Sequence, residues 1–454
     1  MVAETFHRNL KMFFVLSFGE LVSLIGSSLS GFALGVWVYT KTGSVTEFAL
    51  ISFCTSLPGV LLSPLAGTLV DRMDRRWAML ISDSMAGICT LILAILFFTN
   101  RLEVWHIYIL TAISSSVGSL QWPAFSSSTT LMVPSEHLGR VNGVIQGGFA
   151  IAQIIAPALA GFLVVSIGVP GVLLIDFTTF LISIVVLLIV RIPRPALSAE
   201  AKAHQGSVLG EALYGLQYLL SRPALIGLLI FLAVSYFLLG TVGVLVTPLV
   251  LSFTTPSVLG ILFMIGGSGM LIGSLLMGIW GGPAKRIYGV LGFMFIYSFF
   301  IMLAGLQASV ILLGIASFCF YLCQPIVDGC TQTLFQSKVE PGVQGRVFAI
   351  SGLIAGIAGP LSAVIAGPLA DYVFEPLLAV GGPFSGTVVG QIIGVGKGRG
   401  IAFLFITFGL LTMLTAVIGY MIPRIRHIDT DLPTIIPNEP AKAESVPLSD
   451  AVVS

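Results

Sequence analysis

Four carboxylates of this sequence stand inside long apolar stretches, where an ionisable side chain is costly. They are Glu20, Asp83, Asp176 and Asp328. An aspartate at the centre of a membrane-spanning helix costs roughly 2.5 to 3.5 kcal/mol to insert, so a residue of this kind is by default a functional candidate. The chemistry open to such a group is reversible protonation, and we treat all four residues as candidates for it.

Glu20 is the first of these candidates. It lies about eight residues into its apolar stretch, hence roughly 12 Å from the inner end at 1.5 Å per residue. Ser23, Ser27 and Ser30 follow it at helical spacing, so the four side chains form one polar stripe. We favour a stripe that lines a cavity over one that packs against a neighbouring helix, where Glu20 would bond a backbone group.

The three aspartates stand closer to the ends of their apolar stretches, where interfacial water can reach them. For Asp83 and Asp176 a structural role is the favoured interpretation. Asp328 is peculiar to one half of the chain, because the internal repeat described below has Ser126 in its place. We give equal weight to two interpretations of Asp328, a role in coupling and a solvated carboxylate at the cytoplasmic mouth.

The composition indicates an integral membrane protein. Of 454 residues, 56% are hydrophobic and only 9% are charged, against about 25% charged in soluble domains. Apolar runs of the roughly 20 residues that cross a bilayer recur along the chain, and they are continuous rather than alternating, which favours helices over barrel strands. The predicted fold is all-α, with spans at 12–38, 47–69, 77–99, 105–128, 143–167, 172–190, 225–252, 256–279, 287–305, 308–330, 346–374 and 400–422.

The basic residues predict the orientation of these twelve spans. All but Lys41, Arg101, Lys397 and Arg399 of the 21 lysines and arginines fall in the segments on one side, and cytoplasmic loops carry the excess of such residues. We therefore expect both termini to be cytoplasmic and the chain to lie in the plasma (inner) membrane. The first apolar stretch is long enough to span, so we expect it to be retained rather than cleaved.

The chain divides into two similar halves. We predict six-helix bundles at 1–190 and 225–422, a cytoplasmic linker with an amphipathic helix at 191–224, and a disordered cytoplasmic tail at 423–454. Residues 123–141 and 325–347 share Pro, Thr-Leu, Val and Gly-Arg-Val positions. Parallel repeats of six helices are an architecture in which transporters rock two halves around a midplane site. An outer segment at 375–399 is either a mobile lid or, as we favour, an insertion.

One loop and four further stretches carry a family resemblance. The segment 67–76 reads GTLVDRMDRR between spans two and three, and resembles the signature loop of the major facilitator superfamily. Within that superfamily the chain resembles the macrolide-efflux branch through residues 19–26, 41–44, 191–193 and 333–347. Asp74 stands where the family loop usually has glycine, and the fourth span lacks the arginine that usually serves coupling.

The resemblance implies a central path and a cytoplasmic gate. Spans one, four, seven and ten line the path in this superfamily, which adds these neutral candidates: Ser23, Ser27, Gln121, Trp122, Tyr236, Tyr321 and Gln324. Aromatic walls with few polar anchors suit a hydrophobic organic substrate. The predicted gate comprises Gly67, Asp71, Arg72, Arg75, Arg76, Arg140 and Arg346, with Asp71 bridging to the start of span eleven, where helix N–H groups lack partners.

Together these features predict a secondary transporter that exports small hydrophobic molecules of drug, macrolide or siderophore type by alternating access and proton antiport. A facilitator or importer of the same fold and a membrane protein without transport activity are the alternatives. The sequence has no HExxH or Walker loop and its histidines are scattered, so we predict no enzymatic activity, metal or cofactor. The expected partners are the bilayer, the substrate and protons, without nucleic acid, and we expect a monomer.

Overall fold

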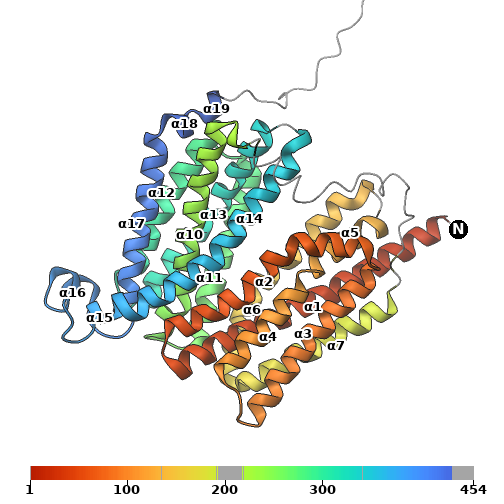
Figure 1. Cartoon of the computed structure of the whole chain (residues 1–454), viewed down its shortest axis with the longest axis horizontal. Coiled ribbons are helices and arrows are strands. Elements are labelled where there is room, and N and C mark those ends of the chain that lie inside the picture. The colour runs from red at the N-terminus through yellow and green to blue at the C-terminus, as the bar shows by residue number, and fades with distance from the viewer. Residues whose placement is uncertain are drawn as a thin grey trace, which may run out of the picture.

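The apolar stretches form two bundles of long helices (Figure 1). A computed structural model describes residues 2–133, 135–190, 192, 217, 219–339 and 341–431, and no strand occurs among them. The first bundle comprises α1 (Val2–Thr42), α2 (Val45–Arg72), α3 (Arg75–Phe98), α4 (Val104–Gly118), α5 (Gln121–Met132), α6 (Ser135–Ser166) and α7 (Gly168–Ile189). The second comprises α10 (Pro223–Leu251), α11 (Pro256–Trp280), α12 (Arg286–Ala304), α13 (Val310–Lys338), α14 (Pro341–Pro368), η1 (Leu369–Phe374), α15 (Glu375–Leu377), α16 (Val388–Ile393), α17 (Arg399–Met421), α18 (Pro423–Arg426) and α19 (Ile428–Asp431).

The predicted spans correspond closely to these helices. Among the described residues, eleven helices are long and apolar enough to cross a membrane. The remaining predicted span, 105–128, is divided between α4 and α5, which have 15 and 12 residues. The all-α fold of two six-span bundles is therefore confirmed, with its fourth span in two pieces.

The break in the fourth span lies about one turn before Pro123. Pro123 has no N–H to donate to the carbonyl of Ser119, so the helical ladder loses a bond there. The N–H of Leu120 donates instead to the carbonyl of Val117, at 3.1 Å, and the Ser119 hydroxyl donates to the Ser116 carbonyl at 2.7 Å. The corresponding Pro325 lies inside α13, which continues unbroken. The break is thus confined to the first half.

The internal repeat is visible in the backbone. Val133 and Val339 each end a helix in an extended conformation, with φ and ψ of −118° and 127° for the first and −107° and 134° for the second. A new helix then begins at Ser135 or Pro341. Arg140 and Arg346 occupy equivalent positions in these helices, although the side chains of both lie outside what the structure describes.

The structure describes little of the predicted linker but the first part of the predicted tail. The amphipathic helix expected at 191–224 lies largely outside the described residues. The segment predicted as a disordered tail begins with α18 and α19, where Ile425 and Ile428 are buried. The backbone N–H of Ile287 also donates to the carboxylate of Asp429 at 3.0 Å. The folded second half therefore extends to Asp431.

The outer segment at 375–399 packs onto its own half. The Glu375 carboxylate accepts the N–H of Gly398 at 3.2 Å and that of Ile401 at 3.0 Å, at the start of α17. Leu378 and Ile393 of the segment are buried in the core of the second half. This packing agrees with an insertion more than with a mobile lid.

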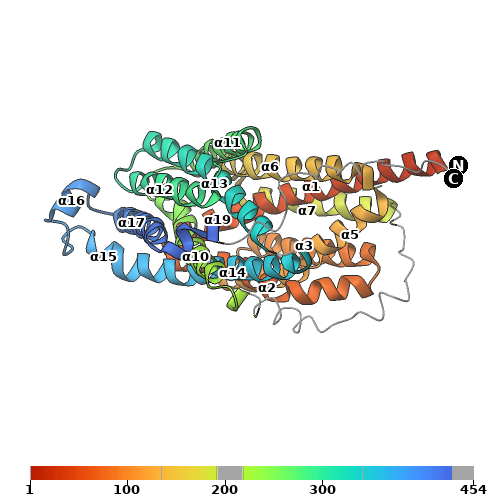
Figure 2. The same ribbon diagram turned by 90° about the horizontal axis from the view of Figure 1, so that it is seen from above.

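The two halves meet at one end and diverge towards the other. Both views show α2 beside α14, and α6 near α11 (Figures 1 and 2). Figure 1 shows the bundles separating towards the end that bears the N terminus, α5 and α19. At the crossing of α6 and α11, a Cβ on Gly161 would lie 2.5 Å from the Pro256 carbonyl oxygen, and one on Gly260 would lie 2.5 Å from that of Pro157. Only glycine permits backbones to approach this closely. The charge distribution predicts that the closed end is the outer one.

A carboxylate of the second half fastens this closed end to the first half. Asp371 accepts hydrogen bonds from the Ser44 hydroxyl at 2.7 Å and from the N–H groups of Val45 and Thr46 at 3.0 and 2.8 Å. Ser44 is the N-cap of α2. The contact satisfies N–H groups that lack partners within the helix, and it places negative charge at the positive end of the helix dipole.

We predict that Asp371→Asn weakens closure of the outer end. A carboxylate at a helix N-terminus contributes roughly 0.3 to 2 kcal/mol, so the ratio of closed to open protein should fall about two- to thirtyfold. The measurement is labelling of Ser27→Cys by an impermeant maleimide added outside cells, in a background with the native cysteines replaced. Glu375→Gln, which removes a helix-capping carboxylate within one half, is the matched control. Equal labelling of Asp371→Asn and the parent would contradict the assignment.

Candidate transport cavity

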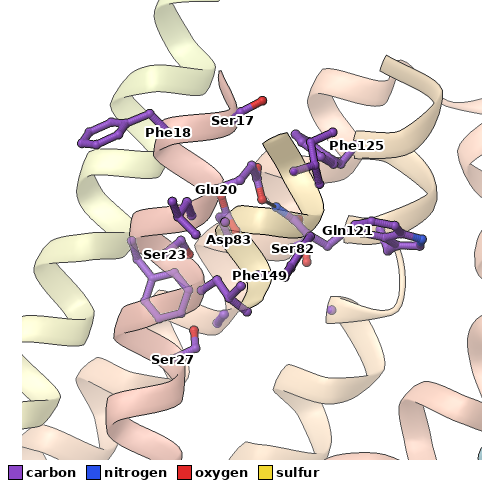
Figure 3. Close-up of a pocket in the computed structure, with 18 of the residues that line it drawn as sticks. Ser17, Phe18, Glu20, Ser23, Ser27, Ser82, Asp83, Gln121, Phe125 and Phe149 are labelled. Carbon is purple, nitrogen blue, oxygen red and sulfur yellow. Dashed lines mark hydrogen bonds between the residues drawn. The ribbon is translucent and has the colours of Figure 1, made fainter. Parts of the chain in front are cut away.

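A cavity of about 570 Å³ lies within the first half, between α1, α3, α4, α5, α6 and α7 (Figure 3). Its wall includes six residues singled out from the sequence: Glu20, Ser23, Ser27, Asp83, Gln121 and Trp122. Ser82, Ser114, Phe149 and Phe180 also line it. Sequence reasoning missed these four because nothing in their type or spacing distinguishes them from ordinary packing residues.

The broken span brings Gln121 to Glu20. Gln121 is the first residue of α5, directly after the break, and its side-chain Nε2 donates to Oε2 of Glu20 at 2.6 Å (Figure 3). Oε1 of Glu20 and Oε1 of Gln121 are buried and have no hydrogen-bond partner among the described residues. The carboxyl group therefore has one neutral donor and one unpaired oxygen, although a buried charge normally needs a paired countercharge.

Asp83 lies behind Glu20 on the wall of the same cavity. It is 4% exposed, and its Oδ2 accepts a hydrogen bond of 2.6 Å from the Ser183 hydroxyl. This bond joins α3 to α7. Asp83 thus combines the structural role favoured from the sequence with a place at the cavity.

Asp176 does not line the cavity. It is 1% exposed, and its Oδ2 accepts from the hydroxyl of Thr90 on α3 at 3.2 Å. A Cβ on Gly26 of α1 would lie 2.8 Å from Oδ1 of Asp176, so the glycine lets α1 approach this carboxyl group. Asp176 stands where α1, α3 and α7 meet, in a position that serves packing.

Aromatic rings form much of the first cavity's surface. Trp122 is 52% exposed, and its ring centroid lies 6.2 Å from that of Phe125 and 5.4 Å from that of Phe149. Aromatic side chains provide large apolar contact areas. The cavity is of a size and character suited to a hydrophobic organic molecule.

The second half contains two adjoining pockets. An apolar pocket of about 330 Å³ is lined by the predicted residues Tyr236, Tyr321 and Gln324. An acidic pocket of about 400 Å³ shares Tyr236 and Gln324 with it and adds Asp328, whose side chain is exposed, together with Thr331. The structure therefore groups the predicted second-half residues. Acids line the spaces in both halves, Glu20 and Asp83 in the first and Asp328 in the second.

The signature loop and the start of α3 contact α5 and α7 at one end of the first half. Asp74 is the N-cap of α3 and accepts the N–H of Arg76 at 3.1 Å, which explains how this position accommodates an acid in place of glycine. The Nε of Arg75 donates to the Ser127 hydroxyl at 2.9 Å, and that of Arg76 to the Leu187 carbonyl at 2.6 Å. The side chains of Asp71 and Arg72 lie outside the described residues.

The fold and the paired cavities are those of a transporter, and comparison with known proteins agrees. Residues 16–363 match the sequence profile of the Major Facilitator Superfamily, so the chain belongs to this superfamily of multi-pass membrane transporters. A mutant form of the nucleoside transporter NupG has the same fold, with a TM-score of 0.70 at 12% identity over 90% of this chain and 99% of that one. A bacterial homologue of the human lysosomal transporter Spinster, in an inward-facing conformation, also gives 0.70, at 14% identity over 94% and 99%.

Within the superfamily the chain belongs to the macrolide-efflux branch. It is 30% identical to Macrolide efflux protein A of Enterococcus faecalis over 321 residues, covering 70% of this chain and 98% of that protein. The corresponding protein of Streptococcus pyogenes is 27% identical over 428 residues, covering 93% and 99%. The resemblance inferred from the signature loop and the four further stretches is confirmed.

We predict that Asp176→Ala lowers the thermal stability of the protein. The substitution leaves the buried Thr90 hydroxyl without its acceptor and opens space beneath Gly26, at a cost of about 1 to 3 kcal/mol. The unfolding midpoint in detergent, compared with that of Glu103→Gln at an exposed outer position, measures the effect. A midpoint equal to that of the control would show that the buried carboxyl group does not stabilise the helix junction.

Proposed function

We propose that this transporter exports hydrophobic organic compounds across the plasma membrane by alternating access, with both termini cytoplasmic, and that protons entering the cell drive the export. The observation that carries the proposal is an acid without a countercharge, Glu20, on the wall of an aromatic cavity. The relatives named as macrolide efflux proteins support the direction of transport. The multidrug efflux pump Tap of Mycolicibacterium fortuitum is 23% identical to this chain over 429 residues.

The arrangement of the halves supports alternating access. They are joined through α2 with α14 and α6 with α11, at the end whose loops hold few basic residues, and they diverge at the basic end (Figure 1). Rocking of two repeats around a central site exposes that site to each side in turn. In the present conformation, compounds would enter from the cytoplasm or from the inner part of the bilayer.

Glu20 supports coupling to protons because its environment suits a group that changes protonation. Its present partner, the amide of Gln121, is neutral and can donate to the carboxyl group in either form. Asp83 is the other acid on the wall of this cavity, and no lysine, arginine or histidine lies on the described part of that wall. Coupling by Glu20 would take the place of coupling by a fourth-span arginine, which this sequence lacks.

We predict that Glu20→Gln abolishes uptake driven by a pH gradient into inverted vesicles. The glutamine preserves the size of the side chain but cannot release a proton. Uptake of a fluorescent drug, with and without a protonophore, measures coupling, and the unfolding midpoint verifies that the variant folds. Glu103→Gln serves as the control. Unchanged pH dependence in Glu20→Gln would remove this residue from the mechanism, and protonophore-insensitive or inward movement in the parent would favour a facilitator or importer.

The cytoplasmic gate is proposed to close through Asp71. The structure begins α14 at Pro341, earlier than the start near Arg346 expected from the sequence, and the first turn of α14 offers helix N–H groups. The resemblance places the signature loop against this end of the helix when the inner side is closed. The second-half loop at 278–286 has no acid, so the mirrored contact is expected to be missing. The contribution should be roughly 0.3 to 2 kcal/mol, weak enough to release.

We therefore expect Asp71→Asn to slow transport by populating inward-open protein. Labelling of Ser27→Cys from the cytoplasmic side of inverted vesicles should increase, because the inner mouth closes less often. The turnover rate and the labelling rate are measured in the same vesicles. Full transport activity with unchanged labelling would count against closure of the cytoplasmic gate through Asp71.

A further inference from the structure

The start of α12 and the segment after α17 carry basic residues that the proposed transport does not use. Lys285 is the N-cap of α12, and Arg424 and Arg426 lie on α18, directly after α17. Residues 281–288 and 418–430 together hold four lysines and arginines and a single acid, Asp429. Figure 1 shows α12 and α17 on the side of the second half away from the first half, with α18 at the end where the halves diverge.

Two tyrosines hold two of these cations in one cluster. The Nζ of Lys285 lies 5.7 Å from the ring centroid of Tyr288, and the guanidinium carbon of Arg426 lies 5.3 Å from that of Tyr420. The two ring centroids are 6.2 Å apart. Because aromatic faces attract cations, the rings order these long side chains. The four residues, which we call the interfacial cluster, connect the start of α12 to the end of α17.

The cations of the interfacial cluster have no countercharge. Neither Lys285 nor Arg426 has a carboxylate within ion-pairing distance among the described residues. The one acid of these segments, Asp429, is engaged elsewhere: its Oδ2 accepts the N–H of Ile287 at 3.0 Å, and its carbonyl oxygen accepts the ammonium of Lys338 at 2.8 Å. The cluster therefore presents two positive charges that an anion could balance.

The surface beside the cluster is apolar and faces lipid. Tyr288, Phe295 and Phe299 follow one face of α12 at helical spacing, and all three are exposed, as is Tyr420. A Cβ on Gly292 would meet no atom within 4 Å, so this face is open between Tyr288 and Phe295. None of these residues lines the cavities. Exposed apolar side chains on a span contact acyl chains, and tyrosines lie typically at the level of the headgroups.

We propose that the interfacial cluster binds the phosphate headgroup of an anionic phospholipid, with an acyl chain along the face that bears Phe295 and Phe299. Lys285 and Arg426 supply the positive charge, and the exposed hydroxyls of the two tyrosines can donate hydrogen bonds to phosphate oxygens. Basic pockets between membrane helices on the cytoplasmic side bind such headgroups. The cluster is separate from the cavities, so the inference is independent of what the protein transports.

The test compares lipids that differ only in headgroup charge. Native mass spectrometry of the purified full-length protein measures binding of phosphatidylglycerol and of phosphatidylcholine with the same acyl chains. We expect phosphatidylglycerol to bind about tenfold or more tightly than phosphatidylcholine, and inorganic phosphate at the same concentration not to displace it. Equal affinity for the two lipids would overturn the proposal, and displacement by inorganic phosphate would overturn the assignment of a lipid as the ligand.

Variants locate the charge that binds the lipid. Arg426→Gln should weaken phosphatidylglycerol binding about fivefold, and adding Lys285→Gln should weaken it further, while binding of phosphatidylcholine stays unchanged. Arg426→Lys, which keeps the charge, should retain most of the preference. Lys11→Gln removes an exposed cation of the first half on the same predicted side and should match the parent. Equal weakening in Lys11→Gln and Arg426→Gln would show only a general attraction of the basic side for anionic lipids.

Binding should also stabilise the protein, because the headgroup contacts both α12 and α17. Phosphatidylglycerol should raise the unfolding midpoint of the parent more than phosphatidylcholine does, and Arg426→Gln should lose most of this difference. An unchanged difference in Arg426→Gln would contradict the site. If the double variant does not fold, Arg426→Gln and the retained preference of Arg426→Lys decide the assignment.

Discussion

The way the two halves meet depends on the bond between Asp371 and the N-terminus of α2, together with the glycine crossing of α6 and α11 at the same end. Both contacts lie near helix ends, so they close one side of the molecule without fixing the other. A carboxylate at a helix N-terminus stabilises such a contact by only roughly 0.3 to 2 kcal/mol, which is close to thermal energy. Such a contact can define a conformation and still be released within a transport cycle.

The positions of the helices could be predicted from the sequence because the bilayer imposes them. A hydrocarbon layer requires about 20 apolar residues per span, and the boundaries fall close to those inferred from composition alone. The break in span four could not be predicted in the same way. Pro123 and Pro325 stand in similar settings, yet only the first divides its helix, since the outcome depends on how neighbouring helices satisfy the freed backbone groups.

The candidate site was predictable to the extent that it lies along one helix. Periodicity placed Glu20, Ser23 and Ser27 on one face, and the structure puts that face on a cavity. The partner of Glu20 was not predictable, because the position of Gln121 depends on the break. The role of Asp371 was also missed, since its bond to Ser44 joins residues 327 apart in sequence, and an acid near the end of a span is too common to indicate such a contact.

Glu20, with its unpaired oxygen, also affects whether the pH difference alone or the membrane voltage as well drives export. A carboxylate that exchanges one monovalent cation for one proton moves no net charge, so the exchange is electroneutral and only the pH difference drives it. A neutral compound exchanged for the same proton moves one positive charge inward, and that step gains about 2.3 kcal/mol per 100 mV of membrane voltage. Voltage dependence would thus vary with the charge of the compound carried, within one unchanged site.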